Sequence, residues 1–575
     1  MADTKTAALD FRDENLDVTK DQRVERRLAR DAFLKALCRY DPGDTLAAWG
    51  QGSKQLQRLQ DLLQQMTDHH GGKIRRVKWI PYGDVGKLSR SGSVFRGDPL
   101  LERLAWMRRR VGPAAFSISG VTHALCDLEV QSGIADYLMA PLESWDALVC
   151  TSQAARRVVL SVCEAMAAYS AERLATSAAL RPTLQLPVIP LGVHCDECDT
   201  TTVNMQALRH QVRAQMEIAA SDVCVLFVGR LSQFAKANPR PMYRALQAAA
   251  QRTKRKVHLM MAGRFADASV EQAFREGAVA HCPDVACHFV GDSTAAMRSG
   301  WASADIFTSL ADSVEESFGP TPLEAMAAGL PVVASDWNGC RETVRDGTDG
   351  ILVPTTFTPS GFGASLAFRH SFNISTHATI AGELALNAAV DQERAAEAYA
   401  ALIGDQGLRQ RMGEAGRRRA RETFDWSRIY PQYRELWGEL EARRRAADTA
   451  SSRSRLPLLP RHPDPFRTYG HYATHTFDLP TRLRLVPRGG FEAWRASLDE
   501  KLLSFEPKER LDPTELKLVF EQLDTAKESA LGELAAALPE GRRDVLVRTV
   551  TWLLKADLVI LVDPIAVPGR PAPLT

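Results

Sequence analysis

The stretch EESFGPTPLEAMAAGLPVVASD, residues 315–336, places a turn, a short helix and a strand in immediate succession. Gly-Pro-Thr-Pro predicts the turn, and the Ala-rich run after it predicts the helix. Gly329 ends that helix, since glycine suits the left-handed position after a helix end. Thr321 and Glu324 have the spacing of a capping box, with Pro322 at the first helical position. The apolar run PVVAS then predicts a buried strand, and this account leaves Glu316 without a role.

Short apolar strands alternate with helical segments on both sides of this stretch. DVCVLFVG, KVHLMMAG, ACHFVG and ADIFTSL are the strands expected between residues 222 and 310, with helices between them. KIRRVKWI, AAFSISG, WDALVCTS and LPVIPLG form a less regular block between about 73 and 200. Such alternation is typical of parallel sheets covered by helices on both faces. The fold class is therefore α/β, with two Rossmann-like doubly wound domains facing across a cleft.

The same pattern gives the domain boundaries. We expect a helical N-terminal extension at 1–70, an N-terminal Rossmann-like domain at 71–215 and a second Rossmann-like domain at 216–445. A linker at 446–474 leads to a small, mainly helical appendage at 475–575, for which a winged-helix-like unit is one interpretation. Only a few basic residues of the appendage could face a nucleic-acid backbone, which favours protein interaction or domain packing over DNA binding.

Composition limits the class of protein. The chain has 575 residues, a net charge of +2 and ten cysteines, so binding to nucleic acid is not indicated. The cysteines are scattered, and Cys195 and Cys198 lack the further ligands of a metal site, which fits a reducing compartment. The N-terminus is acidic and polar, unlike a signal peptide, and no run reaches the ~20 apolar residues of a membrane span. We expect a cytoplasmic protein, with a peripheral position at the inner membrane as an alternative.

A phosphate site is expected where the helix after residue 319 begins. A helix that follows a Gly-containing loop at the carboxyl end of a parallel strand presents free N–H groups to an anion. Such an anion competes with the capping box for the same donors. Gly229, Arg230 and Lys236 follow the strand that ends near residue 229, at the same edge of the sheet. We interpret the two basic side chains as partners of the anion, with Glu316 beside the group that the phosphate carries.

These motifs resemble the retaining glycosyltransferases of the GT-B fold, in particular glycosyltransferase family 4 (glycosyl transferases group 1), whose signature is Glu-x7-Glu. Between about residues 222 and 440 the resemblance rests, in order, on FVGRL with its following Lys, MMAG, ADIFTSL, ESFGPTPLEAMAAGLPVVASDWNGCRETVRDGTDGILVP and RMGEAGRRRARETFDW. SISGVTHAL, DALVCTSQAARRVVL and PVIPLGVH are similar to the family's acceptor-side domain.

The resemblance implies transfer of a sugar from a nucleotide diphosphate sugar of the UDP or GDP type to a hydroxyl group, with retention of configuration. The acceptor is a glycan, a lipid-linked group or a protein, as in the synthesis of bacterial polysaccharides and glycoconjugates. Glu316 corresponds to the glutamate beside the donor sugar, and Glu324 to the one that holds the ribose. Arg230 and Lys236 correspond to the pair that neutralises the diphosphate, and His123 to a histidine near the reacting sugar. The remaining implied donor-site residues are Gly229, Phe318, Gly319 and Thr321.

The sequence contains no Asp-x-Asp, the motif with which metal-requiring glycosyltransferases of another fold hold a cation. We therefore expect an enzyme that needs neither a metal nor another cofactor. Two departures from the family are visible. Pro320 stands where an N–H donor is usual, and the early Gly-Gly loop is absent, with YGDVGKLSRSGSVFRGDP (82–99) as a candidate replacement on the acceptor side.

Other classes remain open. A GT-B epimerase would need its own acidic and histidine residues, and a phosphorylase a cofactor lysine. A catalytically idle relative that serves as a sugar-binding or scaffold subunit is the main alternative. The presence of Glu316, Arg230 and Lys236 speaks against it.

Overall fold

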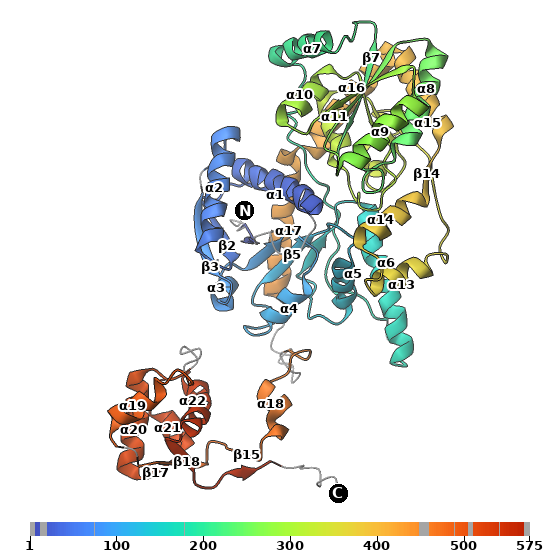
Figure 1. Cartoon of the computed structure of the whole chain (residues 1–575). Helices are drawn as coiled ribbons and strands as arrows, with labels where there is room; N and C mark the ends of the chain where they lie inside the picture. Colours follow the sequence, from blue (N-terminus) through green and yellow to red (C-terminus); the bar gives the residue numbers. More distant parts are fainter. Residues whose placement is uncertain are drawn as a thin grey trace. The chain divides into compact units, whose positions relative to one another are not determined.

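The computed structural model describes residues 6–11, 20–73, 75–177, 179–447, 459–487, 489–503, 510–539 and 541–567. The chain divides into two compact units, Met1–Ser454 and Arg455–Thr575 (Figure 1). Residues 448–458 of the expected linker, and residues 1–5 and 12–19 of the expected N-terminal extension, lie outside the described residues.

The first sheet of the larger unit has six strands in the order β3-β2-β1-β4-β5-β6, and every neighbouring pair is parallel. Its strands are β1 (Ala8–Asp10), β2 (Thr45–Gly50), β3 (Arg76–Pro81), β4 (Ser93–Arg96), β5 (Ser117–Val121) and β6 (Ala147–Val149). The accompanying helices are α1 (Lys20–Tyr40), α2 (Ser53–His70), α3 (Val85–Ser89), α4 (Glu102–Arg108), α5 (Leu128–Ala135), η1 (Asp136–Leu138) and α6 (Gln153–Arg173).

Three expectations for this half of the unit differ from the structure. Residues 1–70 are not a helical extension, because β1 and β2 are central strands of the sheet, where Ala8, Ala48 and Trp49 are fully buried. Residues 82–99 are not a loop, because they contain α3 and the buried strand β4. The expected strand LPVIPLG is reduced to an isolated parallel bridge between Cys150 and Val188.

The second sheet has the order β12-β11-β10-β7-β8-β9 and is also parallel throughout. Its strands are β7 (Val223–Val228), β8 (Val257–Ala262), β9 (Val285–Val290), β10 (Ile306–Ser309), β11 (Val332–Ser335) and β12 (Gly350–Val353). The helices of this half are α7 (Val203–Gln215), α8 (Pro239–Thr253), α9 (Ala268–His281), α10 (Thr294–Ser303), α11 (Pro320–Ala328), α12 (Cys340–Thr343), α15 (Gln392–Gly404), α16 (Gln406–Arg419) and η2 (Ala420–Phe424).

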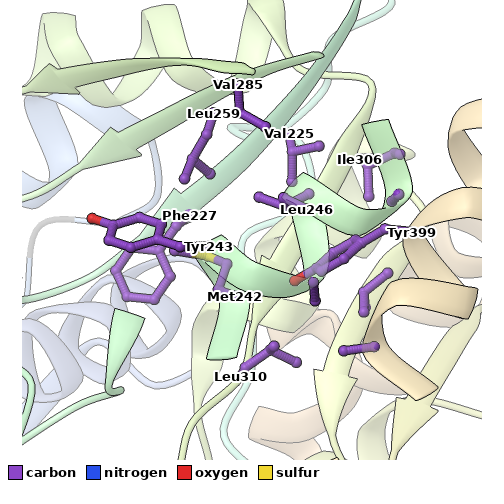
Figure 2. Packing of buried hydrophobic residues seen from close by; sticks show 14 of the residues in the cluster. Val225, Phe227, Met242, Tyr243, Leu246, Leu259, Val285, Ile306, Leu310 and Tyr399 are labelled. Atoms are coloured by element: carbon purple, nitrogen blue, oxygen red, sulfur yellow. The ribbon is translucent and has the colours of Figure 1, made fainter. Parts of the chain in front are cut away.

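The strands expected from residue 222 onward are confirmed, since β7 to β11 lie where the sequence places them. β7 and β8 are almost entirely apolar, and every residue of both strands is buried, because helices cover both faces of the sheet there. Figure 2 shows one such face, where Val225 and Leu259 of the sheet pack against Leu246 of α8 and Tyr399 of α15. An excursion follows β12, made of β13 (Thr355–Phe357), α13 (Ala364–Ser371), α14 (His377–Leu386) and β14 (Ala388–Val390).

The chain passes twice between the two halves of the larger unit, and the two passages are joined. Val193 donates its N–H to the carbonyl of Phe424 over 2.9 Å, and Trp426 donates to the carbonyl of Val193 over 3.1 Å. The chain then continues as α17 (Trp426–Ala446), which was expected to belong to the second domain. Instead α17 packs on the first sheet, since its aromatic face joins the cluster around Phe33, and Trp437 Nε1 donates to Ser119 Oγ of β5 over 3.0 Å.

Further contacts join the halves beside α6. Glu342 of α12 accepts hydrogen bonds from the Gln153 N–H at 2.7 and 2.9 Å and from the Ala154 N–H at 3.3 Å. Ser152 Oγ donates to the carbonyl of Ser317 over 3.0 Å. The second half thus supplies a carboxylate to the N-terminus of a helix of the first half, where the helix dipole favours negative charge.

The smaller unit has its own core, around Trp494, Leu523, Leu546 and Leu553. Its elements are α18 (Pro465–Tyr469), η3 (Gly470–Tyr472), β15 (His475–Thr476), β16 (Arg482–Leu485), α19 (Phe491–Leu498), α20 (Pro513–Ala526), β17 (Glu528–Ala530), α21 (Leu531–Ala536), α22 (Arg543–Lys555), β18 (Val559–Leu561) and β19 (Ile565–Ala566). An antiparallel sheet β17-β16-β18 accompanies the helices. The helical character is confirmed, and the winged-helix interpretation stays a prediction. Within the described parts of the chain, no helix has the length and apolar character needed to cross a membrane.

Candidate functional site

The loop after β7 carries the two basic side chains expected to bind an anion. Gly229 has φ of 152°, and a Cβ there would lie 3.2 Å from Cε of Lys236. Glycine therefore leaves room for the lysine side chain, which is buried and forms an ion pair with the carboxylate of Glu316. Arg230 lies beside it, with Nη2 3.4 Å from Oε2 of Glu315. Each basic group is thus matched with a carboxylate of the β10–α11 loop.

That second loop is held from two directions. Trp337 Nε1 donates to the carbonyl of Ser313 over 3.1 Å, and Asn338 Nδ2 donates to the carbonyl of Glu316. From the first half, the Ser152 hydroxyl donates to the carbonyl of Ser317. These bonds fix the backbone on both sides of Glu316, so its carboxylate is positioned and not left to a free loop.

Helix α11 begins without a side-chain cap. Its N-cap is Gly319, at φ 73° and ψ 88°, and no side-chain hydrogen bond caps it. The expected capping box is wrong, because the helix starts at Pro320 and Thr321 lies inside the first turn. Among the described residues the buried Oγ1 of Thr321 has no hydrogen-bond partner. No side-chain cap therefore competes with an anion for the N–H groups at this helix start, although Pro320 and Pro322 offer no N–H.

Two other predicted residues occupy the same helix region. Glu324 is half-buried in α11, and burial raises the pKa of its carboxyl group while the charge of Lys236 opposes that rise. Phe318 is 2% exposed and belongs to the core cluster that contains Leu323 and Met326. Its side chain therefore anchors the loop in the core.

Asp312 is a site residue that the sequence reasoning missed. It is buried just after β10 and accepts the N–H of Asn238 over 3.2 Å, which ties the Lys236 loop to the Glu316 loop. Burial raises the pKa of Asp312 to about 7, against the lowering effect of its backbone hydrogen bonds. Its position directly after a strand was the available signal.

A second missed group lies where the halves meet. His377, the first residue of α14, places Nε2 2.9 Å from Oε1 of Glu315 and 3.9 Å from Sγ of Cys126. The contacts with Cys126 and then Glu315 raise the pKa of His377 to about 10. Burial alone would raise the pKa of Glu315, but the hydrogen bond from His377 and the charge of Arg230 bring it below its usual value. The predicted His123, half-buried, precedes Cys126 by three residues in the β5–α5 loop.

The structure thus brings Arg230, Lys236, Glu316 and the Gly319 turn to one edge of the second sheet. The carboxyl ends of parallel strands are where α/β sheets bind ligands. The site is suited to a diphosphate because it combines two basic groups, an uncapped helix start and the buried hydroxyl of Thr321. The neighbouring carboxylates can accept hydrogen bonds from a neutral, hydroxylated group.

The fold is of the GT-B type, with two parallel six-stranded sheets flanked by helices. Residues 222–367 match the protein family described as Glycosyl transferases group 1. A solved structure, a glycosyltransferase from Rickettsia africae, has a TM-score of 0.50 at 13% identity and covers 76% of this chain and 98% of its own.

Two curated relatives match part of the chain. The alpha-maltose-1-phosphate synthase of Mycolicibacterium smegmatis is 32% identical over 146 residues, which are 25% of this chain and 30% of the relative. The phosphatidyl-myo-inositol mannosyltransferase of Mycobacterium leprae is 34% identical over 122 residues, 21% of this chain and 23% of the relative. The chain spans less than a third of the length of these two relatives.

Proposed function

We propose that the protein is a retaining glycosyltransferase that moves a sugar from a nucleotide diphosphate sugar to an acceptor hydroxyl. The observation that carries this proposal is that Lys236 and Arg230 form ion pairs with Glu316 and Glu315, in the loop that leads into the uncapped N-terminus of α11. The match of residues 222–367 to the group 1 family supports it.

The chemistry assigns each group a task. Cleavage of the bond between the anomeric carbon and the phosphate oxygen leaves negative charge on the diphosphate and positive charge on the sugar. Lys236, Arg230 and the start of α11 stabilise the leaving diphosphate, by the fixed electrostatics that commonly dominates catalysis. Glu316 lies beside the sugar, and Glu324 binds the ribose.

Retention follows when the acceptor attacks from the face that the diphosphate leaves. The acceptor oxygen forms its bond to the anomeric carbon, and its proton passes to the departing phosphate oxygen. No separate general base is required, and His123 contributes from the first-domain side of the reacting sugar. The two basic side chains supply the positive charge that a divalent cation would provide, so the reaction needs no metal or other cofactor.

The donor is of the UDP or GDP type, and the acceptor is a glycan, lipid-linked group or protein in polysaccharide or glycoconjugate synthesis. The names of the relatives, a maltose-1-phosphate synthase and a phosphatidyl-myo-inositol mannosyltransferase, are compatible with such a role. The protein acts in the cytoplasm, with the membrane surface or a partner protein reached through the smaller unit.

The test is a screen for nucleotide release and thermal stabilisation with UDP-, GDP- and ADP-sugars in the presence of a chelator. A ligand that binds the native state stabilises by about 2.7 kcal/mol at a hundredfold excess over Kd. Lys236→Ala and Glu316→Gln should lower release by roughly 100-fold or more, while the exposed Lys54→Ala keeps wild-type behaviour. If no nucleotide stabilises the wild type and none is released, the protein is an idle sugar-binding or scaffold subunit instead.

A further inference from the structure

Three side chains of metal-binding type meet beside the donor residues. Cys126 comes from the β5–α5 loop, Glu315 from the β10–α11 loop and His377 from the start of α14. One ligand atom of each lies within 4.8 Å of the other two. The sulfur and the carboxylate oxygen both approach the same nitrogen, Nε2 of His377, at 3.9 and 2.9 Å.

We propose that Cys126, Glu315 and His377 form a binding site for Zn²⁺, or for a similar thiophilic divalent ion, between the two Rossmann-like domains. Thiolate, imidazole and carboxylate are the ligands that zinc takes, with bonds of about 2.0–2.3 Å. A tetrahedral ion with such bonds separates its ligand atoms by roughly 3.3–3.6 Å. The observed separations, 2.9 and 3.9 Å from Nε2 of His377 and within 4.8 Å for all three pairs, bracket these values. Water fills the fourth position.

The surroundings of Glu315 suit a metal ligand. Arg230 approaches Oε2, while Oε1 faces His377. One oxygen is therefore oriented by an outer partner and the other is directed at the ion, an arrangement common around metal sites. The imidazole is held at the first position of α14, a helix capped by Thr376, whose hydroxyl accepts the N–H of Thr379 over 3.2 Å.

The ligand types favour zinc over the ions of oxygen-rich sites. Magnesium and calcium prefer oxygen ligands, and a thiolate with an imidazole selects softer ions. All three side chains are half-buried, so the ion is shielded by the two domains and still reached from solvent. Because Cys126 belongs to the first domain and the other ligands to the second, the bound ion cross-links the domains. The site shares Arg230 with the proposed donor site, but the proposed transfer reaction needs no metal, so metal binding is measured separately from transfer.

Cobalt(II) is the probe for this site, since it replaces zinc and reports a bound thiolate by a charge-transfer absorption. Titration of the metal-free full chain should give one equivalent of this absorption, and Zn²⁺ should displace it. Cys126→Ser should abolish the band, and His377→Gln should weaken cobalt binding at least tenfold. Cys287→Ser is the matched control, because this half-buried thiol lies in β9, 3.6 Å from Cys282, and it should leave the band unchanged.

Two results would overturn the proposal. One is an absence of the thiolate band in the wild type. The other is a band that survives in Cys126→Ser or disappears in Cys287→Ser, which would place the metal at another thiol. Thermal unfolding without metal establishes that each variant is folded. If Cys126→Ser fails to fold, His377→Gln decides alone, and unchanged cobalt affinity in that variant refutes the site. Sugar transfer is not the readout, so failure here is distinct from failure of the proposed function.

Discussion

Lys236 and Glu316 form an ion pair that is shielded from solvent. The contribution of this pair to the stability of the protein can be measured separately from catalysis. The two side chains are 10% and 13% exposed, which leaves little solvent screening. Two unit charges about 4 Å apart at an effective dielectric of about 20 interact by about 4 kcal/mol. Replacing Lys236 with methionine removes the attraction and leaves the carboxylate unpaired, which costs about 3–5 kcal/mol for buried pairs. The double variant Lys236→Met with Glu316→Gln carries no unpaired charge and should recover most of the loss.

Calorimetric unfolding of the full chain measures this difference. For a domain of 150–250 residues, each kcal/mol shifts Tm by about 2–4 °C, so the single variant should unfold roughly 6–20 °C lower. The double variant should unfold within about 3 °C of the wild type, yet neither should be stabilised by a nucleotide sugar. Equal losses in the single and double variants would show that the two charges are not coupled. The electrostatic account of the site would then be wrong.

Three further perturbations follow from the geometry of the site. Burial raises the pKa of Asp312 to about 7, so the native state binds an extra proton between about pH 4 and 7 and loses stability as the pH rises through 7. Asp312→Asn should therefore raise Tm at pH 8 by the equivalent of up to about 4 kcal/mol and leave Tm at pH 4 almost unchanged. An equal gain at both pH values would contradict the raised pKa of Asp312. Gly319→Ala forces φ of 73° on a residue with a Cβ and should cost about 1–2 kcal/mol and weaken donor binding in thermal-shift assays, whereas Gly404→Ala, at a position with open space, serves as the neutral comparison. Glu342→Gln weakens the carboxylate contact with the N-terminus of α6 by about 1 kcal/mol, so X-ray scattering should report a larger radius of gyration; an unchanged radius would mean that this contact does not hold the halves together.

The second sheet could be predicted from the sequence, and much of the first could not. Strands such as VCVLFV and VHLMMA are six-residue runs with at most one polar side chain, and turn residues flank them, so their type and bounds are clear. By contrast β1 has three residues and β4 reads SVFR, and neither is long enough to show a period. The assignment of α17 could not be predicted either, because its aromatic face indicates a hydrophobic partner without specifying which sheet provides it.

The candidate site divides in the same way. Gly229, Arg230, Lys236 and Glu316 could be located because each follows a strand whose end is visible in the sequence. The contact between Cys126 and His377 joins residues 251 positions apart, and no local pattern relates them. The start of α11 was misplaced for another reason. Both Pro320 and Pro322 are suited to the first helical position. The helix begins at Pro320 because Gly319, in a left-handed conformation, is its N-cap, and the sequence does not show that conformation.

The paired passages at Val193 and at Phe424–Trp426 determine how the two halves can move. A single connecting strand would let one half swing and swivel freely about its partner. Two connecting segments joined by backbone hydrogen bonds form a hinge. Such a hinge bends readily about one axis and resists twisting. Opening and closing of the two halves should therefore have one main degree of freedom. Cleavage of either passage should allow the halves to rotate about the other axes as well. Cleavage of the chain at only one of these passages should leave both halves folded and let them rotate about every axis of the remaining connection.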